Sequence, residues 1–164
     1  MNPIAIFHCH IQIIKRSIGR SAVAAAAYRS GEKLTNEWDG MTHDYTHKGG
    51  IVHTEIMLPA HAPPDFQDRS TLWNSVEKIE KSSDAQLARE IEVALPVELS
   101  TAEQLALVRV FVKNNFVDAG MCAAFAIHDK GTGTPHAHIL LTIRPLKPDG
   151  HWGPKCRKVY DLDS

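Results

Sequence analysis

The segment His128-Asp129-Lys130-Gly131-Thr132-Gly133-Thr134-Pro135-His136-Ala137-His138-Ile139-Leu140-Leu141 sets three histidines around a connection rich in glycine and threonine. Side chains two residues apart in a strand share a face, so His136 and His138 should project together while Ala137, Ile139 and Leu141 form a buried face. Residues 123–128 have the composition of a preceding strand, and residues 129–135 that of a hairpin connection. Pairing the two strands would bring His128 opposite the His-x-His pair.

Three imidazoles placed in this way favour a metal site. Histidine is a frequent metal ligand, and three neutral rings that leave coordination positions open suit a catalytic site better than a closed structural one. The alternative is a set of polar side chains on a solvated sheet face. That alternative would be favoured for a single histidine, but three at this spacing favour the metal.

Composition limits the class of protein. A chain of 164 residues has the size of one domain and can bury a core. The 18 Lys and Arg nearly balance the 19 Asp and Glu. Basic and acidic residues number 6 and 4 in residues 1–50, 4 and 9 in 51–100, and 8 and 6 in 101–164, so a polyanion should meet the first and last thirds.

The cysteines give no sign of a structural framework. Cys9, Cys122 and Cys156 are odd in number and far apart, which argues against a disulfide scaffold or a zinc ribbon and fits a reducing cytosol. Neither a signal peptide nor an apolar stretch long enough to span a bilayer is evident. We therefore expect a soluble cytoplasmic domain.

Strand and helix patterns alternate along the chain, without repeats or an internal linker. The expected strands are Ile4 to Ile14, Ile51 to Leu58, Glu90 to Leu95, Ala123 to His128 and the strand that begins at His136. The expected helices are Arg20 to Arg29, Ser70 to Lys81, a short one at Ser83 to Leu87, and Ser100 to Asp118. Asn36 to Gly50 should be a loop or irregular hairpin. In the first strand, the face of Ala5, Phe7, Cys9, Ile11 and Ile13 should be apolar, and that of His8, His10 and Gln12 should look toward solvent or a site. Helices packed on an antiparallel β-sheet make an α+β domain.

Two carboxylates occupy one face of the 90–95 strand. Glu90 and Glu92 alternate with Ile91, Val93 and Leu95. If this strand lies beside the histidine strands, a carboxylate can hold an imidazole N–H and fix its tautomer. The alternative is an edge strand with a solvated acidic face.

Tyr28 follows four alanines, Ala24 to Ala27. Small side chains on that turn would let an extended substrate backbone approach, and Arg20, Arg29 and Lys33 are near enough in sequence to contact phosphates. Near a metal-bound phosphate, a positive environment makes attack by a tyrosine oxygen feasible. The alternative is a packed aromatic ring at a helix end.

Together these features resemble the MobA/MobL relaxases, plasmid mobilisation and conjugative-transfer proteins of the HUH endonuclease class, including the N-terminal domain of TraA-type proteins. The resemblance runs over nearly the whole chain. It rests on the three-histidine segment and on the segments Ala5-Ile6-Phe7-His8, Gly19-Arg20-Ser21-Ala22, Tyr28-Arg29-Ser30-Gly31 and Glu90-Ile91-Glu92-Val93-Ala94-Leu95-Pro96-Val97-Glu98-Leu99.

The resemblance implies an HUH relaxase fold and a site- and strand-specific DNA nickase. Tyr28 would attack one phosphodiester of single-stranded DNA at a transfer origin, leaving a 5′-phosphotyrosyl enzyme and a free 3′-hydroxyl. His128, His136 and His138 would bind Mn²⁺ or Mg²⁺, although imidazole ligands also suit other transition metals and Mg²⁺ prefers oxygen. Glu90 would be the acidic residue beside them, with Glu92 as its less certain neighbour. Accessory relaxosome proteins and a coupling protein would be its partners in the bacterial cytoplasm.

Several alternatives stay open. Tyr45 and Tyr160 are the other tyrosines, and His8, His10, His43 and His47 are taken as ordinary polar residues. A replication initiator or transposase of the same class is one rival, although Tyr28 precedes the histidines in the chain. A silent single-stranded DNA-binding module with a structural metal is another, although 7% aromatic residues offer few stacking platforms.

The chain is expected to be a single catalytic domain, 1–164, truncated from a longer multidomain protein. The basic segment Lys155 to Lys158 would then be a DNA contact or the start of a further element.

Overall fold

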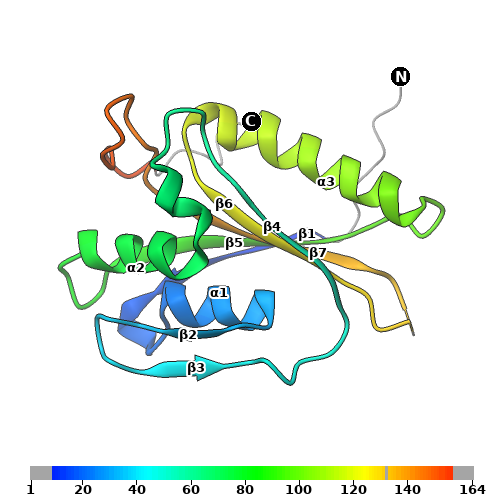
Figure 1. The fold of residues 1–164 in the computed structure, drawn as a ribbon, viewed down its shortest axis with the longest axis horizontal. Helices are drawn as coiled ribbons and strands as arrows, with labels where there is room; N and C mark the ends of the chain where they lie inside the picture. The colour runs from blue at the N-terminus through cyan, green and yellow to red at the C-terminus, as the bar shows by residue number, and fades with distance from the viewer. Residues whose placement is uncertain (1–8, 132, 157–164) are drawn as a thin grey trace.

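The computed structural model describes residues 9–131 and 133–156 (Figure 1). The strands are β1 (Cys9–Lys15), β2 (Lys33–Thr35), β3 (Thr42–Asp44), β4 (Ile51–Met57), β5 (Gln86–Ala94), β6 (Ala123–His128) and β7 (His136–Thr142). The α-helices are α1 (Ala22–Ser30), α2 (Arg69–Ile79) and α3 (Thr101–Asn115), and the 3₁₀ turns are η1 (Arg16–Ile18), η2 (Pro64–Gln67) and η3 (Val117–Ala119).

One antiparallel sheet organises the chain. Its strand order is β1-β5-β7-β6-β4, so the two histidine strands lie together near its centre, and β2 pairs with β3 in a separate hairpin. Helix α3 lies on one side of the sheet, and α1 with the β2–β3 hairpin on the other (Figure 1). The predicted α+β class is confirmed.

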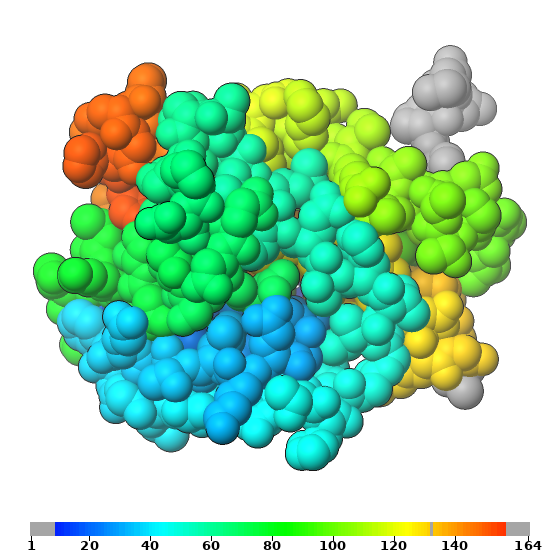
Figure 2. All heavy atoms as spheres, viewed as in Figure 1, coloured from blue at the N-terminus to red at the C-terminus, as the bar shows by residue number. Residues whose placement is uncertain are grey.

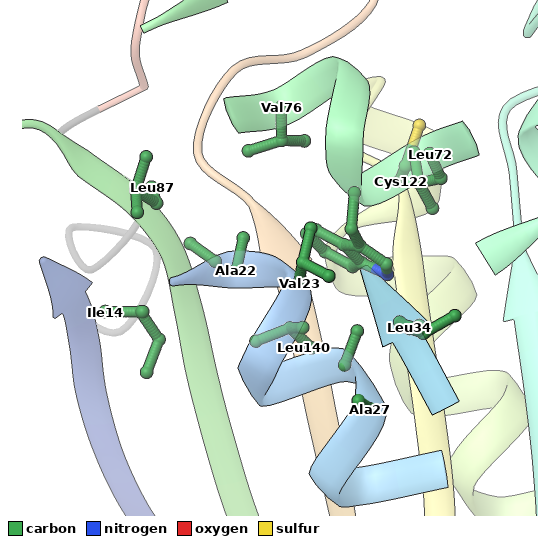
Figure 3. Close-up of a cluster of buried hydrophobic side chains, with 14 of the residues drawn as sticks. Ile14, Ala22, Val23, Ala27, Leu34, Leu72, Val76, Leu87, Cys122 and Leu140 are labelled. Atoms are coloured by element: carbon green, nitrogen blue, oxygen red, sulfur yellow. The ribbon is translucent and has the colours of Figure 1, made fainter. Parts of the chain in front are cut away.

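The face toward α1 carries one apolar core (Figure 3). The small side chains of α1, among them Ala22, Val23 and Ala27, pack against Leu140 of β7 and against Leu72 of α2. Alanines at successive turns let the helix lie close to the strands, and α1 contacts both β6 and β7. This contact fixes the end of α1 beside the histidine strands.

The face toward α3 carries a second core. Its strand residues follow the period of two predicted from sequence: Ala137, Ile139 and Leu141 are fully buried. Val108 and Val112 of α3 cover them. Because this face is filled with apolar side chains, polar chemistry is left to the face of α1.

Helix ends follow their capping residues. The Ser21 side chain accepts a hydrogen bond from Ala24 N at the start of α1, and Gly31 ends that helix in the left-handed region at φ 71°. Ser100 and Glu103 form the predicted capping box of α3. The helix stops at Asn115, and the predicted remainder to Asp118 tightens into η3.

Two predictions were wrong, one about a short helix and one about the buried face of β1. No helix forms over Ser83 to Leu87, because β5 begins at Gln86, where it pairs with Lys15 of β1, and Leu87 is buried in the core. In β1, the face predicted to be apolar is partly open, with Ile11 44% exposed, whereas Ile14 on the opposite face is buried under α1. Residues 4–8 of that prediction lie outside the described residues.

The remaining features of the fold bear on access to α1. The predicted irregular hairpin between residues 36 and 50 is realised by β2 and β3, and β2 begins earlier, at Lys33. In Figure 2 the surface of α1 lies between α2 and the segment that leads from β3 into β4.

Cys122 and Cys156 form no disulfide. Of the described helices, none combines the length and the apolar character needed to cross a bilayer.

Candidate functional site

The register of β5, β7 and β6 gathers the predicted acidic and imidazole side chains. His128 is paired with His136, and Glu92 with His138, all on the face of α1. The ring centroids of His128 and His138 are 4.2 Å apart, and those of His136 and His138 are 6.4 Å apart. The three histidine rings therefore lie close together, as the sequence predicts.

His128 is oriented by the backbone of α1. Its Nε2 lies 2.9 Å from the carbonyl oxygen of Arg29. A carbonyl can only accept, so Nε2 carries the proton and a neutral ring presents the lone pair of Nδ1. Burial lowers the pKa of His128, aided by the charges of Lys48 and Arg29 and opposed by that hydrogen bond.

His138 is the most enclosed of the three histidines. It is 8% exposed, and burial, followed by the charges of His128 and Arg29, lowers its pKa to about 3. Its Nδ1 lies 3.2 Å from Oε1 of Glu92 but makes no hydrogen bond and is buried from solvent. Neutral imidazole, the form that ligates metals, is therefore favoured.

Tyr28 projects from the last turns of α1 and is 41% exposed. Its ring meets Tyr45 edge to face, with centroids 5.1 Å apart. The ammonium of Lys48 lies 3.3 Å from the Tyr28 ring centroid, and the guanidinium of Arg29 lies 4.8 Å from it. The tyrosine thus stands in a cationic environment.

One pocket joins the tyrosine to the histidines. Its walls come from the end of α1, the β3–β4 connection, β5, and the two histidine strands with their connecting loop. The lining residues are Tyr28, Arg29, Lys48, Glu92, His128, Lys130, Gly133, Thr134, His136 and His138. A phosphodiester in this pocket would lie beside the tyrosine, the imidazoles and three cations.

Glu90 has different partners from those expected. Its carboxylate pairs with the Arg29 guanidinium and accepts a hydrogen bond from Gln12 Nε2 at 3.1 Å. Gln12 in turn accepts from Arg20 Nη1 at 3.0 Å. This network joins α1 to β1 and β5, and the carboxylate beside an imidazole is that of Glu92. Strand β5 lies between β1 and β7 with Glu90 4% exposed, which rules out the solvated edge strand.

Other predicted residues lie around or outside the pocket. Lys33 is exposed on β2, where it lies opposite Asp44 in the register with β3, and it does not line the pocket. Lys155 is paired with Glu80, at 3.2 Å. His10 and His47 are exposed, His43 lies on β3, and Tyr45 packs on Tyr28. His8, Tyr160 and residues 157–158 fall outside the described part of the chain.

The three histidines at the pocket offer imidazole nitrogens of the kind that divalent metals bind. Within residues 9–131 and 133–156, no three His, Cys, Asp or Glu side chains are arranged around a common point as a metal would require. The buried Nδ1 of His138 nevertheless has no hydrogen-bond partner, and the pKa values of His128 and His138 are both lowered. A buried, unpartnered nitrogen in a neutral ring is a chemically suitable donor for a divalent ion.

Sequence reasoning missed Lys48, Lys130 and Gln12. The two lysines stand in loops next to glycines, a context shared by many surface lysines, so no local pattern separates them. Gln12 was placed on the face that looks toward a site, but its partner Glu90 depends on which strand neighbours β1.

Comparisons with known proteins agree with this arrangement. Residues 20–164 match the MobA/MobL family. The chain is 44% identical over 170 residues to the conjugal transfer protein TraA of Rhizobium radiobacter, covering 98% of this chain and 15% of TraA. It is 38% identical over 185 residues to the mobilization protein MobL of Acidithiobacillus ferridurans, covering 98% of this chain and 47% of MobL.

A solved structure has the same fold. It was described in work on the molecular basis of vancomycin resistance transfer in Staphylococcus aureus, and it superimposes with a TM-score of 0.86 at 31% identity over 93% of this chain and 78% of its own. The chain spans less than half the length of the TraA and MobL relatives. The family match over most of its length shows that this chain belongs to the MobA/MobL family.

Proposed function

We propose that the chain is the catalytic domain of a DNA relaxase, a nickase and strand transferase that acts on single-stranded DNA at a plasmid transfer origin. The observation that carries this proposal is the single pocket lined by Tyr28 and the three histidines. Membership of a family whose relatives are named for conjugal transfer and mobilization supports the biological setting.

The Tyr28 hydroxyl oxygen attacks the scissile phosphorus. A bond forms between that oxygen and phosphorus as the phenol gives its proton to water, the bond from phosphorus to the 3′ oxygen breaks, and the departing oxygen takes a proton from water to become a free 3′-hydroxyl. The product is a 5′-phosphotyrosyl linkage. Because the phosphoester is conserved, a 3′-hydroxyl can later attack it and reseal the strand without a nucleotide cofactor.

Basic side chains hold the DNA backbone. Arg29, Lys48 and Lys130 border the pocket and suit the reacting phosphate. Arg20 and Lys33 are exposed beyond it, where they suit flanking phosphates. Such contacts position a strand without reading its sequence.

His128, His136 and His138 would hold a divalent ion, Mn²⁺ or Mg²⁺. When bound, that ion polarises the non-bridging phosphate oxygens and offsets the charge that develops in the transition state. Glu92, whose Oε1 lies 3.2 Å from Nδ1 of His138, would supply a carboxylate next to that ring. Glu90 would act indirectly, because its ion pair with Arg29 holds that guanidinium beside the Tyr28 ring.

A covalent-capture experiment tests the proposal. The protein is incubated with Mn²⁺ and a labelled pool of single-stranded oligonucleotides of random sequence, and denaturation-resistant adducts are isolated and sequenced. We expect an adduct enriched in one nick site, abolished by Tyr28→Phe and retained in Tyr45→Phe. Binding without any adduct would instead indicate a silent DNA-binding module.

In the cell, we propose that this domain works in the bacterial cytoplasm as part of a longer protein, together with accessory relaxosome proteins and a coupling protein. The solved relative and the TraA and MobL proteins are all longer than the region that matches this chain. The absence of a membrane-crossing helix among the described residues is compatible with that setting.

A further inference from the structure

Lys48 reaches the tyrosine from a loop that is remote in sequence. It lies between β3 and β4, twenty residues after Tyr28, yet its Nζ is 3.3 Å from the Tyr28 ring centroid. The same Nζ donates to the Tyr28 carbonyl oxygen at 2.9 Å. One side chain therefore touches both the backbone and the ring of the proposed nucleophile.

The loop that carries Lys48 is fastened to the histidine strands. Asp129 N donates to Gly50 O at 2.8 Å. Gly50 has φ 81°, a backbone conformation that favours glycine, and a Cβ there would lie 3.1 Å from Cγ of Lys130. The position of Lys48 is thus tied to the loop that precedes His136.

The electrostatic setting of Lys48 indicates an anionic ligand. Burial, together with the charges of Arg29 and Lys130, lowers its pKa to about 8, and Glu90 opposes this only in part. Among the ion pairs of the described residues, none joins Lys48 to a carboxylate. Holding a cation among cations is unfavourable unless an anion binds there.

An ammonium has three N–H donors, and the Tyr28 carbonyl takes one of them. We propose that Lys48 is a catalytic residue that clamps the Tyr28 ring and donates its remaining hydrogen bonds to the phosphate that Tyr28 attacks. This inference rests on the proposed relaxase function. It gives Lys48 two roles, holding the nucleophile in place and offsetting charge on the reacting phosphate.

Three variants separate this role from general DNA binding. Lys48→Met removes the charge, Lys48→Arg keeps it, and Lys113→Met removes an exposed lysine on α3, on the other side of the sheet. The probe is the oligonucleotide recovered by covalent capture, with Mn²⁺. Single-turnover adduct formation and equilibrium binding are measured separately, after far-UV circular dichroism has shown that each variant is folded.

The expected result is a split between rate and affinity. Lys48→Met should slow adduct formation by about 100-fold, the loss typical of one donor to a transition-state anion. Its affinity for the oligonucleotide should fall by less than about tenfold, because many phosphate contacts share the binding energy. Lys48→Arg should recover most of the rate, and Lys113→Met should match the parent protein.

Several results would overturn the proposed role of Lys48. A Lys48→Met protein that forms the Tyr28 adduct at the parental rate overturns the role of Lys48 and leaves the proposed function intact. A loss confined to affinity also overturns it, since Lys48 would then be a binding contact only. If Lys48→Met does not fold, Lys48→Gln replaces it under the same criteria. Failure of the parent protein to form any adduct removes both proposals.

Discussion

Glu90 and Glu92 show how two identical residues on one strand face acquire different environments. Glu90 is enclosed by Arg29 and Gln12, whereas the Glu92 side chain is 39% exposed and faces His138. The first carboxylate anchors the helix that carries Tyr28. The second lies beside an imidazole. Glu90 should therefore matter to stability and Glu92 to the histidines.

Glu90→Gln should destabilise the fold, because it leaves Arg29 without its counter-charge. We expect a loss of about 2–3 kcal/mol in the free energy of unfolding, at the low end for a buried pair because Arg29 keeps some solvent contact. Urea denaturation measures it. Glu92→Gln is the matched control on the same strand and should change stability little. Equal losses in the two variants would contradict this division.

His136→Ala should weaken metal binding without removing DNA binding. The imidazole is one of three proposed ligands, whereas arginine and lysine contacts supply most of the affinity for single-stranded DNA. Calorimetric titration with Mn²⁺ and a separate oligonucleotide-binding assay measure the two effects. His151→Ala, an exposed histidine outside the pocket, is the control. Loss of both activities in His136→Ala would indicate a structural metal.

The placement of the histidines could be predicted from sequence, because a period of two and one short connection decide it. The partners of Glu90 could not be predicted. They depend on which strand lies on each side of β5, and the connections from β1 to β5 and from β5 to β7 are too long to reveal that order. The same reason hid Lys48, whose contact with Tyr28 is set by packing between loops.

At the scale of elements, α1 is held at both ends. At its start, the Ala22 N–H donates to Oε2 of Glu77 on α2 at 2.6 Å, and Arg16 pairs with the same carboxylate at 2.9 Å. At its end, Arg29 is held by Glu90. A helix fixed in this way holds Tyr28 at the pocket, as its proposed attack on a phosphate requires.

Glu77→Gln should loosen the start of α1. The side chain is 1% exposed, and neutralising it leaves Arg16 with backbone carbonyls but no carboxylate partner among the described ion pairs, at a cost of about 3 kcal/mol. Thermal or urea unfolding measures the loss. Glu98→Gln, at an exposed glutamate, should be silent. A Glu77→Gln protein as stable as the Glu98→Gln control would show that α1 needs no such anchor.

Element type was predictable where periodicity and caps agreed, as for the capping box of α3 and the alternating residues of β7. It failed over residues 83–87, where a short helix was expected. The polar residues there form the turn before β5, and Ser82 accepts a hydrogen bond from Asp84 N. Strand pairing with β1, which local sequence does not contain, decided the outcome.

For the whole molecule, the two faces of the sheet differ in polarity. The α3 face is apolar and supplies stability, while the α1 face is apolar under α1 and α2 and polar beyond the end of α1. The fold class followed from the sequence because strands and helices were separately recognisable. The order of strands did not follow, since it depends on long-range pairing.

Acid should destabilise the molecule partly through Glu80. Burial opposes its ionisation, but hydrogen bonds from Arg144 and Lys155 outweigh burial and lower its pKa. A carboxyl with a lowered pKa in the folded state contributes stability above its unfolded pKa of about 4.3, and the contribution is lost as pH falls through the folded value. Urea midpoints should therefore drop as the pH falls below the unfolded pKa and then through the lower folded one. The stability difference between the parent and Glu80→Gln should shrink there; a constant difference would contradict this assignment.

Tyr28 and the three histidines are proposed to form one catalytic site. Its most direct test is to digest the covalent protein–oligonucleotide adduct formed with Mn²⁺ and to locate the modified residue by mass spectrometry. We predict a nucleotide phosphate on Tyr28, and no adduct in Tyr28→Phe. A phosphate on Tyr45, or an adduct that survives Tyr28→Phe, would contradict the account.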